Sequence, residues 1–379
     1  MDVVRSVVAF VAVLVVLVVV HELGHFLAAK AAGVTVQEFA VGFPPRLASR
    51  FWRGTRYSLN WLPLGGFVRM LGEDGDIEAK KMRDSGLSEM AIETAMQGAF
   101  NRKPLAVRIG VLLAGVAMNF VLAGVLFSVF FAMPSAALRG GLVVDSIQAG
   151  SPAQDAGLRA GDIIETADGR SFEDPNDLRD YVSGKAGRYV DLGVSRGDRT
   201  VHMSVMPRQL TQADIRQGKG AVGFGWHPQK VVEGDPIASN PVSAVAMGFG
   251  SDGAAGLAVQ LPGGLVDAVG GLLGLNADAG SALGPIGIAE QTGRILDSPL
   301  PVQGFVYFVA LLSINLAVVN VLPFPPLDGG RTLVVVAEAI GRRRLPAERA
   351  ALIYLTGFMV LLALVILISI QDVQRLIEG

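Results

Sequence analysis

Long apolar blocks alternate with polar stretches along the chain. Four blocks approach or exceed the roughly 20 residues that an α-helix needs to cross a bilayer. They occupy about residues 7–29, 109–133, 305–322 and 351–370. The first block reaches that length only if the polar residues of "HELGHFLAA" continue its helix. The pattern therefore predicts a polytopic α-helical membrane protein with four transmembrane helices.

The basic residues of the connecting loops predict how this protein is oriented. Arginine and lysine gather between the first and second blocks and again in "GRRRLPAER", 341–349. Because cytoplasmic loops carry an excess of these residues, both loops are expected in the cytoplasm. Both termini and the stretch 134–300 would then lie outside. No A-x-A-like cleavage site follows the first block, so we expect it to stay as an uncleaved helix.

The polar stretches contain two further patterns. Residues 140–207 alternate apolar-rich strand signals with turns and one helical segment, which predicts an inserted α/β domain. The segment "TRYSLNWLPLGGFVRML", 55–71, alternates in the manner of a strand or hairpin. We expect four parts: an N-terminal membrane part with the hairpin, the α/β domain, a linker with amphipathic or interfacial helices, and a C-terminal membrane part. Their bounds are 1–133, 134–208, 209–300 and 301–379.

Composition narrows the chemistry that the chain can support. Among 379 residues there is no cysteine, so a metal site would have to use histidine, aspartate or glutamate. The net charge of −2 gives no indication of a basic surface that would bind nucleic acid.

The clearest candidate chemistry is "HELGH" at the end of the first block, because it matches H-E-x-x-H. On a helix, His21 and His25 share one face and can bind one Zn²⁺, while Glu22 can act as the general base. The alternative is that the three side chains only pair with one another. Ionisable groups in a spanning helix are costly, by about 2.5 kcal/mol or more each, so a compensating metal is favoured.

A catalytic zinc site usually has three protein ligands and one open position. "NVLPFPPLDGGR", 320–331, offers Asp328 at the cytoplasmic end of the third block, in the same leaflet as the two histidines. Asp328 could instead cap the helix that follows it. Asn320 could contact the substrate or an oxyanion, or could equally join helices in the membrane. Asn119 in the second block could contact the substrate, but a structural role between helices is favoured.

These motifs together resemble the site-2 protease family of intramembrane zinc metalloproteases, in its bacterial regulator-of-sigma-E protease branch. The matching pieces, in order, are "HELGH", "LPLGGFVRM", "GVAMNF", "GPIGIAEQTG" and "NVLPFPPLDGGR". The resemblance implies one zinc ion per chain. It also implies His21, His25 and Asp328 as ligands, Glu22 as the catalytic base and Asn320 as a substrate or transition-state contact.

Residues 140–207 resemble a bacterial, circularly permuted PDZ domain through "GSPAQDAGLRAGDIIETADGRSF". The fold class expected is therefore a polytopic membrane protein with a membrane-associated β-hairpin and an inserted PDZ domain. Two positions depart from the relatives: "GVAMN" lacks their Gly-Pro, and Pro44-Pro45 replaces the glycine that usually follows "GF". A PDZ domain could bind a peptide or C-terminus, or could exclude substrates with bulky outer domains.

The function expected is cleavage of a transmembrane helix near its cytoplasmic side, in the bacterial inner membrane. By resemblance, the substrate is a single-pass protein such as a trimmed anti-sigma factor or a signal-peptide remnant. The hairpin edge around Leu64, Gly65, Gly66 and Phe67 could hold that substrate as an added strand. The alternatives are a membrane-anchored zincin that acts in the aqueous phase and a non-catalytic PDZ scaffold.

Overall fold

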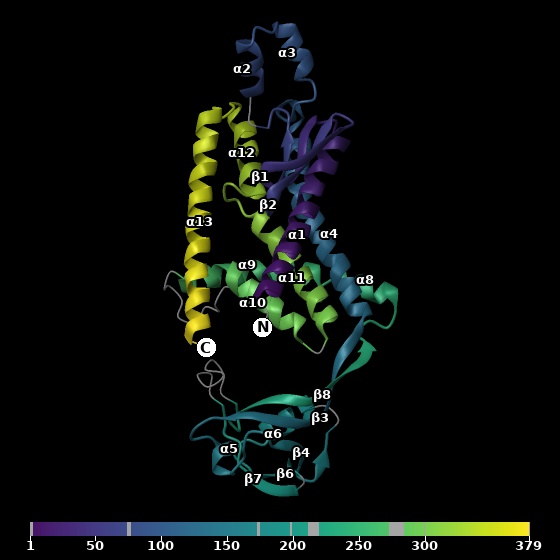
Figure 1. Cartoon of the computed structure of the whole chain (residues 1–379), viewed down its shortest axis with the longest axis vertical. Coiled ribbons are helices and arrows are strands. Elements are labelled where there is room, and N and C mark those ends of the chain that lie inside the picture. Colours follow the sequence, from purple (N-terminus) through teal and green to yellow (C-terminus); the bar gives the residue numbers. More distant parts are fainter. Residues whose placement is uncertain are drawn as a thin grey trace. The chain divides into compact units, whose positions relative to one another are not determined.

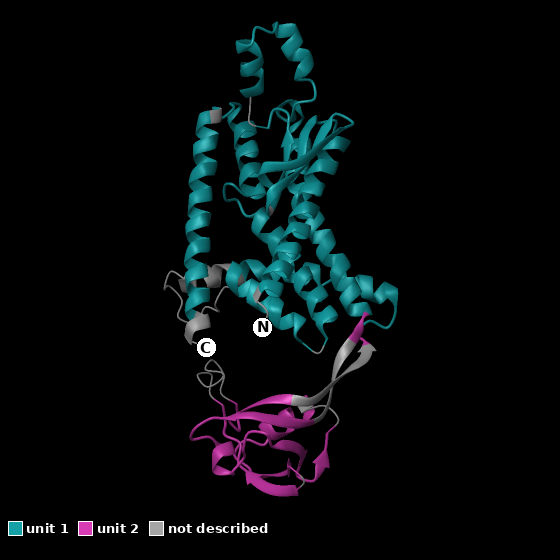
Figure 2. Cartoon of the chain, viewed as in Figure 1, with its two compact units in different colours: residues 1–132, 238–379 teal, residues 133–237 magenta. Residues whose placement is uncertain are grey.

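The computed structural model of the protein describes residues 3–73, 77–172, 175–197, 199–210, 220–272, 284–298 and 300–378. These residues form two compact units, one of residues 1–132 and 238–379 and the other of residues 133–237 (Figure 2). Each unit has its own apolar core. The first contains the long apolar helices, and the second contains most of the β-structure (Figure 1).

Helices cover all four apolar blocks, and each is long and apolar enough to cross a membrane. They are α1 (Val3–Ala31), α4 (Leu105–Ala132), α11 (Pro301–Val321) and α13 (Ala347–Glu378). A fifth stretch, 241–263, meets the same criterion of length and composition. It joins α8 (Pro241–Phe249) to the first half of α9 (Ala254–Leu272), within the region expected to hold a linker and interfacial helices. The number of spans therefore stays a prediction.

Small residues allow the helices of the first unit to approach closely. A Cβ added at Gly24 of α1 would lie 2.8 Å from the main-chain carbon of Ala114 on α4. On another side of α4, Phe127 and its neighbours share a buried core with Ala310 and Ile314 of α11. Because lipid tails are as apolar as these side chains, the helices associate through such close packing.

Shorter helices complete the first unit. Their bounds are Ile77–Asp84 (α2), Glu89–Ala95 (α3), Pro285–Leu296 (α10) and Asp328–Gly341 (α12), with a 3₁₀ turn at Phe100–Arg102. The buried carboxylate of Asp372, near the end of α13, accepts hydrogen bonds from the N–H groups of Gly284 (3.2 Å) and Gly287 (2.8 Å). It thus caps the N-terminus of α10, where the orphan N–H groups of a helix need partners.

A long hairpin follows α1 and contains the strand expected at 55–71. Its strands are β1 (Val36–Trp52) and β2 (Thr55–Met70). The first half of β1 pairs on one side with residues 66–70 of β2, and on the other with residues 56–59, because both strands bend back. Among the described strands, residues 66–70 therefore have a partner on one side only, and their other edge is open.

The described residues of the second unit form an antiparallel sheet and two helices. The strand order is β7-β6-β4-β3-β8, with β5 paired to β4. The bounds are β3 Pro134–Ile147, β4 Ile163–Ala167, β5 Arg170–Ser171, β6 Val190–Arg196, β7 Arg199–Val205, β8 Phe224–Pro236, α5 Pro152–Asp155 and α6 Pro175–Ser183. The final strand comes from the stretch 209–300 that the sequence analysis treated as linker. Residues 211–219 and 273–283 of that stretch lie outside the described residues.

A buried ion pair ties the turn before β4 to the end of β6. Arg196 donates two hydrogen bonds of 2.6 Å to the carboxylate of Asp162, whose side chain is 2% exposed. Burial by itself would raise the pKa of Asp162, but the bonds from Arg196 and from the Arg159 N–H lower it. The pair therefore stabilises the unit above the unfolded-state pKa of about 4, and this stabilisation is lost as the pH falls toward the lower folded-state pKa.

We expect Arg196→Leu to destabilise the second unit by about 3 kcal/mol, because it leaves a buried carboxylate without its partner. Limited proteolysis of the full chain in detergent at pH 7 would measure this as faster cleavage within residues 133–237. The matched control is Arg199→Leu, since Arg199 is exposed and makes no ion pair with a described residue. Equal protease resistance of the two variants at pH 7 would contradict the assigned role of the pair.

Candidate active site

His21 and His25 lie one turn apart near the C-terminal end of α1. Both side chains are buried, and their Nε2 atoms are 3.1 Å apart. The i, i+4 spacing places them on one helix face, as the motif predicts. That face is turned toward α4.

Asp328 reaches the same point from the other end of the chain. The helix α11 ends at Val321, a Pro-rich turn follows, and Asp328 begins α12. Its Oδ2 lies 2.9 Å from His21 Nε2 and 3.2 Å from His25 Nε2. The turn is tight enough to require glycine: a Cβ at Gly330 would lie 2.5 Å from the main-chain nitrogen of Pro325, and one at Gly329 would overlap main-chain oxygens.

The three side chains fit a zinc ion. Their ligand atoms all lie within 4.8 Å of one another, and all three residues are buried. Ligands at zinc–nitrogen distances of 2.0–2.1 Å form a tetrahedron with edges of about 3.3–3.4 Å, close to the observed separations. Although Asp328 Oδ2 is near both imidazoles, it accepts no well-aligned hydrogen bond from a described residue. A buried carboxylate oxygen that lies between two imidazole nitrogens without a well-aligned hydrogen bond is the arrangement that a cation would satisfy.

The helix α4 supplies the outer wall of this cluster. The Nδ1 atom of His25 lies 2.8 Å from the Val111 carbonyl oxygen, and the Nδ1 atom of His21 lies 3.2 Å from the Asn119 amide nitrogen. Between them, a Cβ added at Gly115 would lie 2.7 Å from His21 Nε2 and would overlap His25 Nε2. These three positions are four residues apart on α4 and form one stripe that faces the histidines.

Glu22 lies against β2 at Gly66. It follows His21 on α1 and is partly buried. A Cβ added at Gly66 of β2 would lie 3.3 Å from Glu22 Cγ and 2.8 Å from the Ala40 carbonyl oxygen. The absence of a side chain at Gly66 thus lets the strand pass next to the proposed base.

The structure places the remaining sequence candidates in different surroundings. Leu64, Gly65, Gly66 and Phe67 all lie on β2, at or next to the edge beside α1. Asn320 is in the last turn of α11, partly buried, and no described residue hydrogen-bonds its amide. Asn119 is completely buried against His21. His202 and His227 pair instead with Asp191 and Asp145, on the exposed surface of the second unit.

A part-buried ion pair near the site could not be predicted from the sequence. The guanidinium of Arg331, three residues after Asp328, pairs with the carboxylate of Glu73 just beyond β2. The other oxygen of Glu73 accepts a hydrogen bond of 3.0 Å from the Met70 N–H. The pair thus ties the end of the hairpin to the start of α12. The only signal in the sequence was an arginine directly after "LDGG", and nothing there named its partner 258 residues away.

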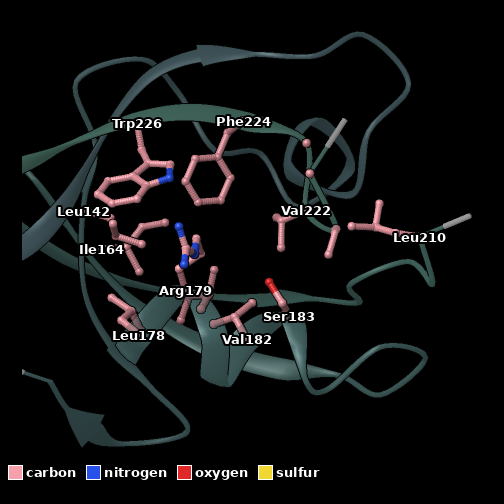
Figure 3. Close-up of a pocket in the computed structure, with 14 residues that line it drawn as sticks. Leu142, Ile164, Leu178, Arg179, Val182, Ser183, Leu210, Val222, Phe224 and Trp226 are labelled. Carbon is pink, nitrogen blue, oxygen red and sulfur yellow. The ribbon is translucent and has the colours of Figure 1, made fainter. Parts of the chain in front are cut away.

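The second unit contains an apolar pocket of about 270 Å³ between β8 and α6. Figure 3 shows Phe224 and Trp226 on one side of it and Leu178 and Val182 on the other. The chain at Val222 and Gly223 closes one end, and no described residue accepts a hydrogen bond from these two N–H groups. Because β8 is the last strand of its sheet, its outer edge is also open to an added strand among the described residues.

Comparison with known proteins places the whole chain in one family. Residues 9–364 match the model of peptidase family M50. The metalloprotease MmpA of Caulobacter vibrioides is 30% identical over 96% of this chain and 94% of its own length. The regulator of sigma-W protease RasP of Bacillus subtilis is 29% identical over 98% of this chain and 99% of its own length. A Clostridium perfringens protein provisionally named a zinc metalloprotease is 32% identical over 94% of this chain and 95% of its own length.

One solved structure matches part of the chain. The PDZ domain of the SdrC-like protein from Listeria monocytogenes matches 23% of this chain and 88% of its own, at 26% identity and a TM-score of 0.20. The family match, in contrast, includes both segments of the first unit and thus all three residues of the candidate zinc site. The chain therefore belongs to peptidase family M50 and is a zinc metalloprotease.

Proposed function

We propose that the chain is an endopeptidase that cleaves the transmembrane helix of single-pass membrane proteins. The observation that carries this proposal is the burial of His21, His25 and Asp328 among helices apolar enough to cross a membrane. An aqueous-phase zincin would have no need for this placement. A non-catalytic scaffold would have no need for Glu22 against a strand that has one edge unpaired among the described strands.

The roles of the residues follow from their positions. His21, His25 and Asp328 would hold one zinc ion, which when bound makes water acidic enough to act as a nucleophile near pH 7. Glu22 takes the proton of the attacking water and returns it to the leaving amine. Asn320, whose amide is free of described partners, would donate to the developing oxyanion or to the substrate backbone.

A helical substrate must be unwound before it can be cut, because its carbonyls are already hydrogen-bonded. The open edge of residues 66–70 supports a way to hold the unwound segment. The substrate would add to this edge as a strand, and its backbone would then lie next to Glu22. The strand residues from Leu64 to Phe67 would form the contact.

The proposed orientation of the protein in the membrane rests on the distribution of its basic residues. The arginine-rich turn 342–344 and the loop 30–103 would face the cytoplasm of a bacterial cell, with the active site near that side of the inner membrane. Residues 133–237 would then face outward. Fragments released into the cytoplasm, such as that of a trimmed anti-sigma factor, could change transcription, and signal-peptide remnants are the second substrate class.

The apolar pocket favours a second activity, in which the proposed PDZ unit binds the C-terminus of a peptide. An apolar terminal side chain would enter between Phe224 and Val182, and the carboxylate would meet the free N–H groups of Val222 and Gly223. A C-terminus newly made by an earlier cut in the substrate has this chemistry. We therefore favour a PDZ unit that selects substrates by binding their C-termini over one that only keeps substrates with large outer domains away from the active site.

The decisive experiment measures zinc and cleavage together. We expect Glu22→Gln to keep the zinc content of wild type but to lower cleavage of a single-pass model substrate by about 10²–10⁴-fold, because only the base is removed. Metal analysis and a gel-based cleavage assay on detergent-purified protein would measure both. A normal cleavage rate in this variant would remove Glu22 from the reaction.

The helix α4 offers a matched pair of glycines. Gly115→Ala should weaken zinc binding by at least about tenfold, because its Cβ would collide with the Nε2 atoms of both histidines. Gly110→Ala should leave zinc binding unchanged, because its Cβ would have no neighbour within 4 Å. Chelator competition gives both dissociation constants, and equal values for the two variants would place the metal elsewhere.

The pocket is tested with one peptide in two forms, ending in leucine with either a free carboxylate or an amide. We expect the free acid to bind the full chain at least about tenfold more tightly, since the amide loses the charge that the N–H groups bind. Ser183→Trp, at the wall of the pocket, should abolish this preference, whereas His202→Trp, on the exposed face of β7, should not. Equal affinities of the two peptides for wild type would contradict binding of a C-terminus.

A further inference from the structure

Asn119 is a buried polar residue that lies directly against a histidine of the candidate zinc site. Asn119 is fully buried on α4, with its amide nitrogen 3.2 Å from His21 Nδ1. In this orientation the amide oxygen is buried and has no hydrogen-bond partner among the described residues. The main chain at this position is held separately, because Ser313 Oγ of α11 donates to the Asn119 carbonyl oxygen at 2.8 Å.

His25 shows what a zinc-binding imidazole needs from its surroundings. Its Nδ1 lies 2.8 Å from the Val111 carbonyl oxygen, and a carbonyl can only accept. The proton of His25 is therefore on Nδ1, and the lone pair of Nε2 is directed at the cluster. His21 has no such carbonyl at its Nδ1, and the only described side chain that bonds this atom is Asn119.

The two orientations of the Asn119 amide occupy nearly the same space but have opposite effects on His21. With nitrogen toward the ring, the amide donates to Nδ1, so the ring proton must sit on Nε2, the atom needed for the metal. With oxygen toward the ring, the amide accepts the proton of Nδ1, and Nε2 is left with a free lone pair. Only the second orientation is compatible with zinc binding by His21.

We propose that Asn119 is a positioning residue for the metal site: its amide oxygen accepts the Nδ1 proton of His21 and thereby fixes the tautomer and ring orientation that bind zinc. This inference rests on the proposed zinc site of His21, His25 and Asp328. It replaces the expectation that Asn119 contacts the substrate, because a side chain with no exposed surface cannot do so without rearrangement. It also gives a reason for the spacing of "GVAMN": Gly115 admits the histidines, and Asn119, one turn later, orients one of them.

Two substitutions of similar shape separate this role from simple packing. Asn119→Asp keeps an acceptor for the Nδ1 proton, whereas Asn119→Leu fills the space without one. Removing a group that orients a zinc-bound histidine typically weakens metal binding about 10–100-fold. We therefore expect the leucine variant to bind zinc 10–100-fold more weakly than wild type, and the aspartate variant to bind it at least as tightly as wild type.

The measurement is the dissociation constant for Zn²⁺ of the full chain in detergent, by competition with a chelator of known affinity. Ser313→Ala is the control, because it removes the hydrogen bond to the Asn119 main chain and leaves the amide in place; its zinc affinity should match wild type. If the leucine variant does not fold, Asn119→Ala provides the acceptor-free comparison, with the same loss expected.

The possible outcomes decide between the explanations. Wild-type affinity in an acceptor-free variant would overturn the inference, as would an equal loss in the aspartate and acceptor-free variants, which would indicate packing alone. Failure of wild type itself to bind zinc would instead contradict the proposed metal site. Zinc affinity that follows the acceptor would establish Asn119 as the group that prepares His21.

Discussion

The structure of the first unit depends on one constraint: a carboxylate and two imidazoles must meet inside a bundle of apolar helices. Each of these groups is costly at membrane depth unless it is paired or bound to a metal. His21 and His25 come from α1, and Asp328 comes from the start of α12, more than 300 residues later. The glycines and the ion pair around these side chains allow α1 and the start of α12 to come together and keep the three groups buried.

Glycine makes this meeting possible on both sides. Gly24 and Gly115 let α1 and α4 approach until α4 itself forms a wall of the site, and Gly329 and Gly330 let the chain turn tightly before α12. The ion pair between Arg331 and Glu73 then joins that turn to the hairpin. The proposed base, the proposed metal ligands and β2 are thus parts of one connected framework, which is the preorganisation that catalysis by positioned groups requires.

Each unit has a strand with one edge unpaired among the described residues, and the two edges are proposed to bind different parts of a substrate. In the first unit, one edge of β2 residues 66–70 has no partner among the described strands, and Gly66 of this segment lies against Glu22, where a substrate strand would be cut. In the second, the open edge of β8 lies beside an apolar pocket, where a peptide end would be held. Both use main-chain hydrogen bonds, which bind an extended peptide largely independently of its sequence, and leave selectivity to nearby side chains.

The sequence by itself predicted the apolar helices and the candidate zinc ligands His21, His25 and Asp328, because run length and motif spacing are local signals. Hydrophobic run length predicts a span, and i, i+4 spacing predicts that His21 and His25 share a face. The sequence could not determine contacts between distant segments: the pairing of β8 with β3, the Arg331–Glu73 ion pair and the burial of Asn119 against His21. These contacts are decided by tertiary packing. The sequence of a strand does not specify which strand it pairs with. An asparagine in an apolar helix has the same neighbours in sequence whether it faces substrate, lipid or an imidazole.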